Sequence, residues 1–253
     1  MKLSRKRRML SAVGKDIVGS YGGRRVLERM ERFFEARLAE YDRHMTEEIA
    51  GAREFYAQTA AALPMHPGCR VLDLGCGTGL ELEAYFRLNP AAQVTGIDLS
   101  PAMLGRLKEK FPEKPLRLIC GSYFEVEFSE GYDAAVSVES LHHFPPAQKA
   151  ALYRRLSEAL SDGGYLILTD YFAASEDFEK ACFAALEEKK REEGIRDEAL
   201  YHYDTPLTAE HEMRLLQEAG FADTAVVGTW GDTHMIRAEK HRRNSENRNR
   251  REI

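Results

Sequence analysis

The chain has 253 residues, of which 43% are hydrophobic and 30% charged, and its formal net charge is −5. This length fits one domain with an appendage better than two equal domains, and the composition is that of a soluble globular protein. Because no apolar stretch is long enough to span a bilayer and no hydrophobic signal core follows the basic N-terminus, we expect a cytoplasmic protein without a membrane partner.

The charge is unevenly distributed along the chain. Residues 1–30 hold nine Lys and Arg against two acids, and residues 237–253 hold seven against three. Residues 31–236 keep 20 basic and 36 acidic side chains, a formal charge of −16. A body this acidic repels phosphate backbones, which argues against a nucleic-acid groove on it. We interpret the basic ends as solvated tails, with contact to RNA or a membrane surface as the alternative.

The N-terminal part predicts helices. Apolar residues recur at three- and four-residue steps from Arg24 to about Met45, as in an amphipathic helix. A second helix is expected over about 47–62, with Thr46 as its N-cap. We therefore expect an N-terminal helical segment, a main domain and a disordered polar tail, with the bounds 1–45, 46–240 and 241–253.

Residues 69–79 predict a strand, a tight turn and the start of a helix. The apolar run 71–74 is typical of a buried parallel strand, and glycines at 75, 77 and 79 punctuate the turn that follows. Glycines let a backbone approach a ligand closely, and the free amides of the first helical turn face that ligand. This stretch therefore indicates a ligand cradle.

Strands and helices alternate beyond the cradle. The alternation predicts a parallel sheet with right-handed crossovers. It ends in a hairpin that turns at Gly231-Asp232. The four cysteines lack metal-type spacing, and we interpret them as buried thiols. We expect strands at about 93–97, 116–120, 133–138, 165–169, 222–229 and 233–239, and helices at about 100–110, 145–160, 174–193 and 208–220.

The pattern Asp73-x-Gly75-x-Gly77-x-Gly79 resembles the first motif of class I S-adenosylmethionine (SAM) dependent methyltransferases. A second strand that ends in Asp98 supports the resemblance, since a ribose-binding acid is expected roughly 20 residues further on. Leu80 stands where a dinucleotide fingerprint has its last glycine, which counts against a nicotinamide-dependent oxidoreductase.

The resemblance implies a fold and a cofactor. The fold is an α/β, Rossmann-like, doubly wound sheet of seven strands in the order 3-2-1-4-5-7-6, with the last strand antiparallel. An N-terminal helical cap and a lid over residues 171–206, inserted after the fifth strand, complete it. The cofactor is SAM, the product is S-adenosylhomocysteine (SAH), and no metal is involved.

The resemblance also assigns cofactor contacts residue by residue. Asp73 would lie near the ammonium end of SAM, Asp98 would accept from both ribose hydroxyls, and Leu99 and Met103 would sandwich the adenine. Met103 as a core residue of its helix is the alternative. Ser122 stands where the family usually has an acid, which puts the adenine contacts in doubt. The remaining expected contacts are Tyr41, Gly75, Cys76, Gly77, Gly79, Tyr123 and Glu139.

Two histidines are the candidates for catalysis. His142 and His143 follow the fourth strand, at the carboxyl edge where open α/β sheets bind ligands, and either one could act as a general base or simply cap a loop. Tyr201, His202, Tyr203 and Trp230 line an acceptor pocket or form a core between lid and sheet. Tyr41 either closes over the cofactor or is an interfacial core aromatic.

The leading hypothesis is a SAM-dependent methyltransferase that acts on a small-molecule acceptor. Three alternatives remain, namely an RNA or protein methyltransferase that recruits its substrate through the basic ends, a non-catalytic SAM-binding protein, and a nicotinamide-dependent oxidoreductase. The sequence leaves open the acceptor, the methylated atom and the oligomeric state, a homodimer included. We expect the lid to order when the cofactor binds.

Overall fold

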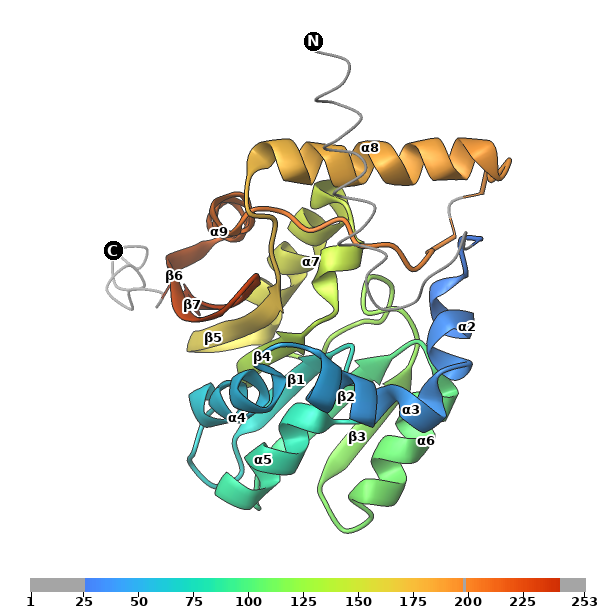
Figure 1. Ribbon diagram of the computed structural model, residues 1–253. Helices are drawn as coiled ribbons and strands as arrows, with labels where there is room; N and C mark the ends of the chain where they lie inside the picture. The colour runs from blue at the N-terminus through green and yellow to red at the C-terminus, as the bar shows by residue number, and fades with distance from the viewer. Residues whose placement is uncertain (1–25, 198, 242–253) are drawn as a thin grey trace, which may run out of the picture.

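The computed structural model describes residues 26–197 and 199–241, which contain one seven-stranded sheet in the order β3-β2-β1-β4-β5-β7-β6 (Figure 1). Neighbouring strands from β3 to β5 pair in parallel, and β7 runs antiparallel to both β5 and β6. The predicted strand order is therefore confirmed. The strands are β1 (Arg70–Leu74), β2 (Gln93–Asp98), β3 (Leu116–Cys120), β4 (Tyr132–Val138), β5 (Leu160–Tyr171), β6 (Phe221–Trp230) and β7 (Thr233–Lys240).

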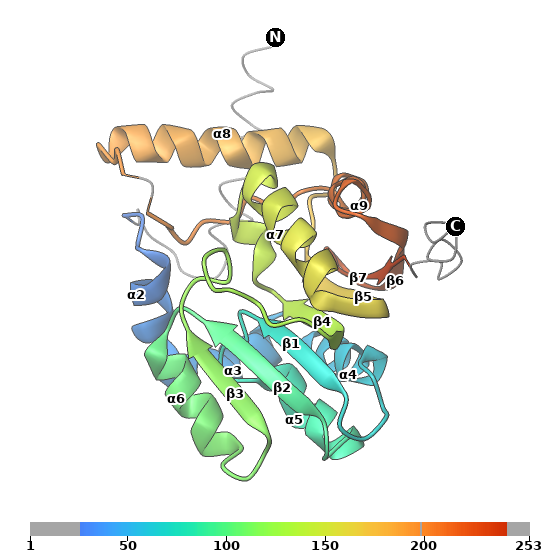
Figure 2. The same cartoon turned by 180° about the vertical axis from the view of Figure 1, so that it is seen from behind.

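Helices cover both faces of the sheet. The helices α4 and α5 lie on the face turned to the viewer in Figure 1, α7 and α9 lie on the opposite face in Figure 2, and the long α8 crosses above the sheet. The helical elements are α2 (Met30–Glu35), α3 (Leu38–Arg43), the π-helical turn η1 (His44–Glu48), α4 (Ala52–Ala62), α5 (Leu80–Leu88), α6 (Pro101–Lys110), the 3₁₀ turn η2 (Leu141–His143), α7 (Pro146–Ala159), α8 (Glu176–Glu192) and α9 (Ala209–Glu218).

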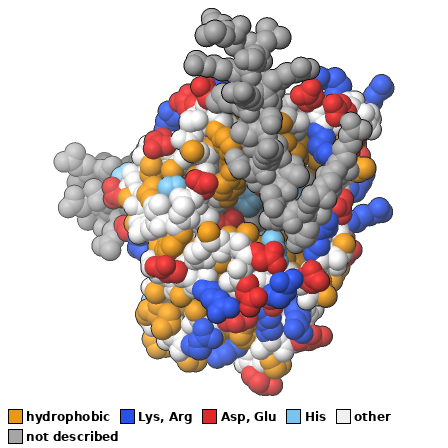
Figure 3. All heavy atoms as spheres, in the orientation of Figure 1, with side chains coloured by type: hydrophobic (Ala, Val, Ile, Leu, Met, Phe, Trp, Pro, Cys, Tyr) orange, Lys and Arg blue, Asp and Glu red, His pale blue; other side chains and the backbone are white. Residues whose placement is uncertain are grey.

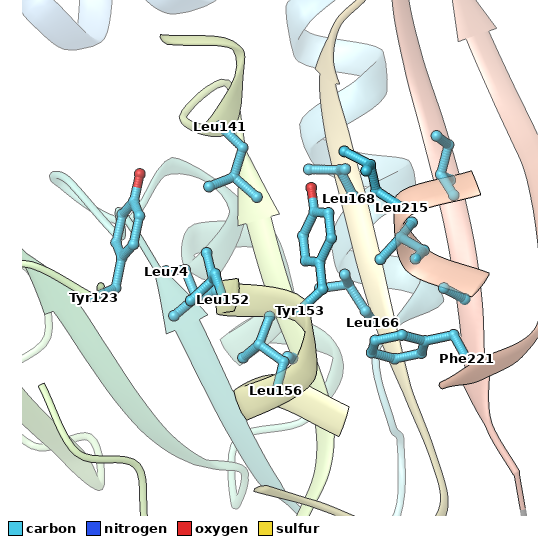
Figure 4. Close-up of a cluster of buried hydrophobic side chains, with 14 of the residues drawn as sticks. Leu74, Tyr123, Leu141, Leu152, Tyr153, Leu156, Leu166, Leu168, Leu215 and Phe221 are labelled. Atoms are coloured by element: carbon cyan, nitrogen blue, oxygen red, sulfur yellow. The ribbon is translucent and has the colours of Figure 1, made fainter. Parts of the chain in front are cut away.

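Successive residues of the central strands enter two separate cores, because side chains alternate across a strand. Leu166 and Leu168 pack with Leu152 of α7 in the cluster of Figure 4, whereas Ile167 packs with Phe55 of α4 on the other face. Both faces of these strands are thus buried, which explains the near-continuous apolar runs of the sequence.

Helix starts follow the capping residues of the sequence. The Ser100 hydroxyl accepts a hydrogen bond from the Met103 amide, with Pro101 at the first helical position. Thr208 caps α9 in the same way by accepting from the His211 amide. The predicted starts of α6 and α9 are therefore confirmed.

The N-terminal segment differs from its prediction of one helix from 24 to 45. The helix breaks at Arg37, whose guanidinium binds the Phe33 carbonyl and Glu28, and the chain restarts as α3. Thr46 is not an N-cap, since its hydroxyl donates to the Asp42 carbonyl. The cap of α4 is Gly51, at φ +75°.

The turn expected at residues 162–164 is also different. The helix α7 ends at Ala159 and Leu160 already belongs to β5, so Gly163, at φ +80°, lies within a strand. The β4–β5 register shifts at this point, between Tyr132 and Ala134, which makes it an irregularity of the sheet and not a helix stop.

Two further expectations concern the ends of the chain and the membrane. Residues 1–22 and the predicted tail, apart from His241, lie outside the described residues. None of the helices within 26–197 and 199–241 combines the length and the apolar character that a bilayer crossing requires.

Candidate functional site

The loop after β1 contains three glycines in left-handed conformations, with φ of +72°, +48° and +74° at Gly75, Gly77 and Gly79. A Cβ on Gly75 would stand 2.2 Å from the Ser140 hydroxyl, and one on Gly79 would stand 2.3 Å from Leu107 Cδ1. A Cβ on Gly77 would meet nothing nearer than the Tyr41 hydroxyl at 3.7 Å. Protein packing therefore requires Gly75 and Gly79, whereas a Cβ on Gly77 would make an ordinary van der Waals contact with Tyr41.

The helix α3 is fixed over this loop by Asp42. The Thr78 hydroxyl donates to Asp42 Oδ1, and Lys110 Nζ of α6 pairs with Asp42 Oδ2 at 2.6 Å. Lys110 also pairs with Glu83 of α5 at 3.1 Å. In Figure 3, acidic and basic side chains alternate over the lower part of the view, where Figure 1 shows α3, α5 and α6. These contacts place the neighbouring Tyr41 against Gly77, and a contact of Tyr41 with the cofactor stays a prediction.

Asp98, at the end of β2, supports the same loop. Its Oδ2 accepts from the Gly77 amide at 2.9 Å and its Oδ1 from the Ser100 amide at 2.8 Å. Each carboxylate oxygen can accept a further bond. Burial raises the pKa of Asp98, although these two amides oppose the shift. The ribose contact expected of Asp98 stays a prediction, and the carboxylate is held at the loop where it would act.

A second pair of acids lies buried under the loop. Asp73 is 1% exposed and Glu81, in the first turn of α5, is 4% exposed. Asp73 Oδ2 and Glu81 Oε1 have no hydrogen-bond partner among the described residues. Burial, together with the adjacent Glu81, raises the pKa of Asp73 well above its ordinary value, and burial also raises the pKa of Glu81. Burial and mutual repulsion therefore favour a pair that shares one proton over a pair with two charges. The sequence analysis did not identify Glu81, because its only local signal is a position in the first turn of the predicted helix.

The buried pair makes stability depend on pH. Above pH 4 the unfolded chain ionises Asp73, whose ordinary pKa is 3.8, while the folded chain keeps the proton, so stability falls as pH rises toward the folded pKa. Asp73→Asn removes this cost. We expect its urea midpoint to exceed that of wild type at pH 8 and the difference to shrink toward pH 4. The exposed Asp223→Asn is the control, and a lower midpoint for Asp73→Asn at pH 8 would contradict the interpretation.

Other expected cofactor residues lie in the core. Met103 is 1% exposed, and Cys76, which is 3% exposed, has its Sγ 2.7 Å from where a Cβ on Gly96 would stand. These positions favour the core interpretation of both side chains. Leu99 is half-buried, and the Ser122 hydroxyl accepts from the Phe124 amide at 3.2 Å.

Tyr123 connects two parts of the carboxyl edge. It is 5% exposed, and its hydroxyl is 3.1 Å from the Ser140 hydroxyl, beside Gly75. Its ring meets the edge of Phe144 at 5.8 Å between centroids. The residue therefore packs β3's loop against the segment after β4.

His142 lies between two carboxylates at the carboxyl edge. Its Nδ1 is 2.5 Å from Asp170 Oδ1, at the end of β5, and its Nε2 is 3.6 Å from Asp204 Oδ1. Asp170 also accepts from the amides of Leu141 and Tyr171, at 2.8 and 2.9 Å. Burial opposes a charge on His142, but the two carboxylates prevail and hold its pKa well above the ordinary value. We therefore assign His142 as an imidazolium.

His143 is in a different state although it is adjacent. Its Nδ1 lies 3.3 Å from both the Tyr203 carbonyl and Asp204 Oδ1. Burial and the charge of His142 lower the pKa of His143, so it is neutral at pH 7. An Nδ1–H bonded to these oxygens leaves Nε2 as the acceptor. Asp204 was missed in the sequence, because nothing local to it indicates a partner after β4.

The predicted lid joins the N-terminal helices beside these histidines. His202 stacks on Phe33 of α2 at 3.4 Å between ring centroids, and its ring lies 4.7 Å from His143. Burial holds the pKa of His202 well below its ordinary value. Tyr201 forms a β-bridge with Arg29. Trp230 packs elsewhere, against Phe55, so it does not join this aromatic cluster.

Two groups of donors come within 4.8 Å of one another, His142–His143–Asp204 and Glu139–His142–Asp170. Such a spacing is compatible with a metal ion. The ion pairs and hydrogen bonds within the protein already account for these contacts, so we assign neither group as metal ligands.

Comparison with known proteins gives the family. Residues 71–164 match the model of a methyltransferase domain. The chain is 33% identical over 180 residues to a carboxy-S-adenosyl-L-methionine synthase of Citrifermentans bemidjiense, covering 65% of this chain and 73% of that protein. It is 26% identical over 143 residues to a malonyl-[acyl-carrier protein] O-methyltransferase of Anoxybacillus flavithermus, covering 56% of this chain and only about half, 52%, of the length of that relative.

The fold is similar to that of a solved methyltransferase. The magnesium protoporphyrin IX methyltransferase of Synechocystis, with bound SAH, superposes with a TM-score of 0.58 at 18% identity, over 83% of this chain and 97% of that one. Fold, glycine loop and relatives agree. The chain belongs to the class I family of SAM-dependent methyltransferase enzymes.

Proposed function

We propose that this protein transfers the methyl group of SAM to a small-molecule acceptor. The observation that carries the proposal is the set of carboxyl groups at the glycine loop. Asp98 accepts from the Gly77 amide at 2.9 Å, and Asp42, next to Tyr41, accepts from the Thr78 hydroxyl. Carboxyl oxygens at a glycine loop suit SAM, whose ribose hydroxyls and ammonium group are donors.

The residues of the loop fit the separate parts of this cofactor. The pair of Asp73 and Glu81 offers buried oxygens that accept from no other protein donor, and an ammonium group would supply one. The cofactor backbone would lie along the face of Gly77 that Tyr41 covers, and Asp98 would take the ribose hydroxyls. When bound, SAM supplies an electrophilic methyl group on sulfur.

His143 is the general base that we propose, for an acceptor that is a hydroxyl or a protonated amine. It is neutral, and its tautomer leaves Nε2 free to accept a proton. His142 is a positioning group in this proposal, because its two nitrogens face Asp170 and Asp204.

The cytoplasmic location and the absence of a metal stay predictions.

The acceptor class is supported by charge and by the relatives. A net charge of −16 over residues 31–236 disfavours polyanionic acceptors such as RNA. A screen of metabolite extracts that reads SAH release tests the proposal, with His143→Ala as the test of the base. SAM binding without SAH release from any acceptor would favour a non-catalytic protein, and failure to bind SAM would overturn the proposal.

A second candidate function is the formation of a carboxylated SAM. The 33% identity to a carboxy-S-adenosyl-L-methionine synthase favours it. The two functions differ in their products, since methyl transfer releases SAH whereas this reaction leaves a SAM derivative of higher mass. Mass spectrometry of the cofactor pool in the same screen therefore separates them.

Asp98→Ala should weaken the binding of both SAM and SAH. Loss of one partner of two buried hydroxyls costs on the order of 1–3 kcal/mol, which corresponds to about 5- to 150-fold in Kd. Isothermal titration calorimetry measures the change, with the exposed Asp162→Ala as the control. Unchanged affinity in Asp98→Ala would remove the assignment of Asp98 to the ribose.

A further inference from the structure

Glu139 has a strained backbone. Its φ is +49°, and among the residues that the structure describes it is the one non-glycine residue with positive φ. Its amide donates to the Thr169 carbonyl of β5 at 2.8 Å, directly after the central strand β4 ends. Such a conformation persists only where the surroundings fix it, and strain of this kind is concentrated at functional sites.

The carboxylate of Glu139 lies at the boundary between the two halves of the site. Its Oε1 accepts from the Thr233 hydroxyl of β7 at 3.0 Å. On one side, one of its oxygens comes within 4.8 Å of a ring nitrogen of His142 and an oxygen of Asp170. On the other side, the next residue, Ser140, lies against the glycine loop, since a Cβ on Gly75 would stand 2.2 Å from its hydroxyl. The backbone hence aims a carboxylate between the glycine loop and the histidines.

The other nearby acids are already engaged. Asp170 accepts from Leu141, Tyr171 and His142, and Asp204 pairs with His142 and His143. Within the described chain, Glu139 Oε2 makes no hydrogen bond and no ion pair, so one oxygen of this carboxylate can serve a ligand.

We propose that Glu139 is the anion that faces the sulfonium of bound SAM and distinguishes SAM from SAH. This inference rests on the proposed function and assigns one part of its site. SAM and SAH share the amino-acid head, the ribose and the adenine, and they differ only in the sulfonium charge and its methyl group. A group that recognises this difference must lie where the methyl meets the acceptor, and Glu139 lies at that boundary.

The charge of Glu139 changes within an accessible pH range. Burial, then the charge of Asp170, raise its pKa to about 7, while His142 and the Thr233 hydroxyl lower it and Asp204 raises it. The remaining groups that face it, the phenols of Tyr41 and Tyr56, are neutral, since burial raises both their pKa values. Above pH 7 the carboxylate is ionised and attracts a sulfonium, and below pH 6 it is protonated and does not.

The test is the ratio of the SAH and SAM dissociation constants, measured by calorimetry on the full chain from pH 5.5 to 8.5. All groups common to the two ligands cancel in this ratio. In wild type we expect SAM affinity to gain about tenfold over SAH affinity as pH rises through 7. In Glu139→Gln the ratio should stay at the low-pH value, with SAH affinity within twofold of wild type. The exposed Glu125→Gln is the control and should follow wild type.

A second variant separates strain from charge. Glu139→Gly relieves the positive φ, so it should melt at a higher temperature than wild type and still show the flat ratio. A pH-independent ratio in wild type, or an unaltered pH dependence in Glu139→Gln, would overturn the assignment and leave the proposed function standing. Failure of both SAM and SAH to bind wild type would instead overturn the proposed function.

Discussion

Glu212→Gln is expected to lower the free energy of unfolding by about 3–5 kcal/mol, because it strands a buried charge. Lys149 of α7 is 2% exposed and Glu212 of α9 is 1% exposed. Lys149 Nζ donates to Glu212 Oε2 at 2.7 Å, and the Tyr153 hydroxyl donates to Glu212 Oε1. An amide at position 212 cannot neutralise the ammonium, which would remain buried without a counter-charge.

Urea unfolding measures this loss, with two comparisons. Glu176→Gln breaks the Lys180–Glu176 pair, whose side chains are 69% and 65% exposed, and should cost less than about 1 kcal/mol. The double variant Lys149→Met/Glu212→Gln removes both charges and should regain part of the loss, since no unpaired charge remains. A cost below 1 kcal/mol in Glu212→Gln alone would show that water reaches the pair.

The Lys149–Glu212 pair also connects the stability of the fold to the geometry around the two histidines. The helix α7 follows His142 and His143, and α9 follows Asp204. Clamping these two helices together fixes the segments that bring Asp204 within 3.6 Å of His142. Lys149 additionally helps to lower the pKa of Asp170, so its charge supports the carboxylate that holds His142.

The elements that the sequence predicted well are those whose signals are local. Strand β3 has the predicted bounds Leu116–Cys120, between Pro115 and Gly121. The α6 start at Ser100-Pro101 depends on one hydroxyl and one amide three residues apart. The strand order came from the family resemblance, because no local pattern specifies which strands become neighbours.

The N-terminal helix was predicted poorly for the opposite reason. Apolar spacing continues through residues 36–37, and it contains no signal for a break. The break depends on two contacts. The Arg37 guanidinium binds Glu28, and His202, which comes from a segment far along the chain, stacks against Phe33. Such contacts override periodicity, and they exist only in the folded chain.

The site divides along the same line. The place of Asp98 beside the glycine loop could be predicted, because its separation from the loop along the chain is characteristic. The roles of Glu81 and Asp204 could not be predicted, because each depends on a partner from another element. That partner is Asp73 for Glu81 and the two histidines for Asp204. The protonation states of His142 and His143 could not be predicted either, because they depend on Asp170 and Asp204.

Gly77→Val is expected to abolish SAM binding in a protein that still folds. At φ +48° a β-branched residue is strained, and this costs about 1–2 kcal/mol, which a folded domain tolerates. The Cβ itself makes only an ordinary van der Waals contact, with the Tyr41 hydroxyl 3.7 Å away. The two branched methyl groups would then cover the face of the loop along which we propose that the cofactor backbone lies. Calorimetry should show a loss of more than about 100-fold in affinity, or about 3 kcal/mol.

The matched pair Gly77→Ala and Gly79→Ala separates the cradle from the packing around it. Both positions have positive φ, so alanine is strained in each, and only their surroundings differ. The methyl group at 79 would stand 2.3 Å from Leu107 Cδ1 in the core, whereas that at 77 would make an ordinary van der Waals contact with the Tyr41 hydroxyl at 3.7 Å. Gly79→Ala should therefore lose more free energy of unfolding in urea than Gly77→Ala. Gly77→Ala should show the larger loss of SAM affinity relative to its loss of unfolding free energy. If Gly77→Val melted normally and bound SAM within a few-fold of wild type, the cofactor would not lie along the face of the loop at Gly77.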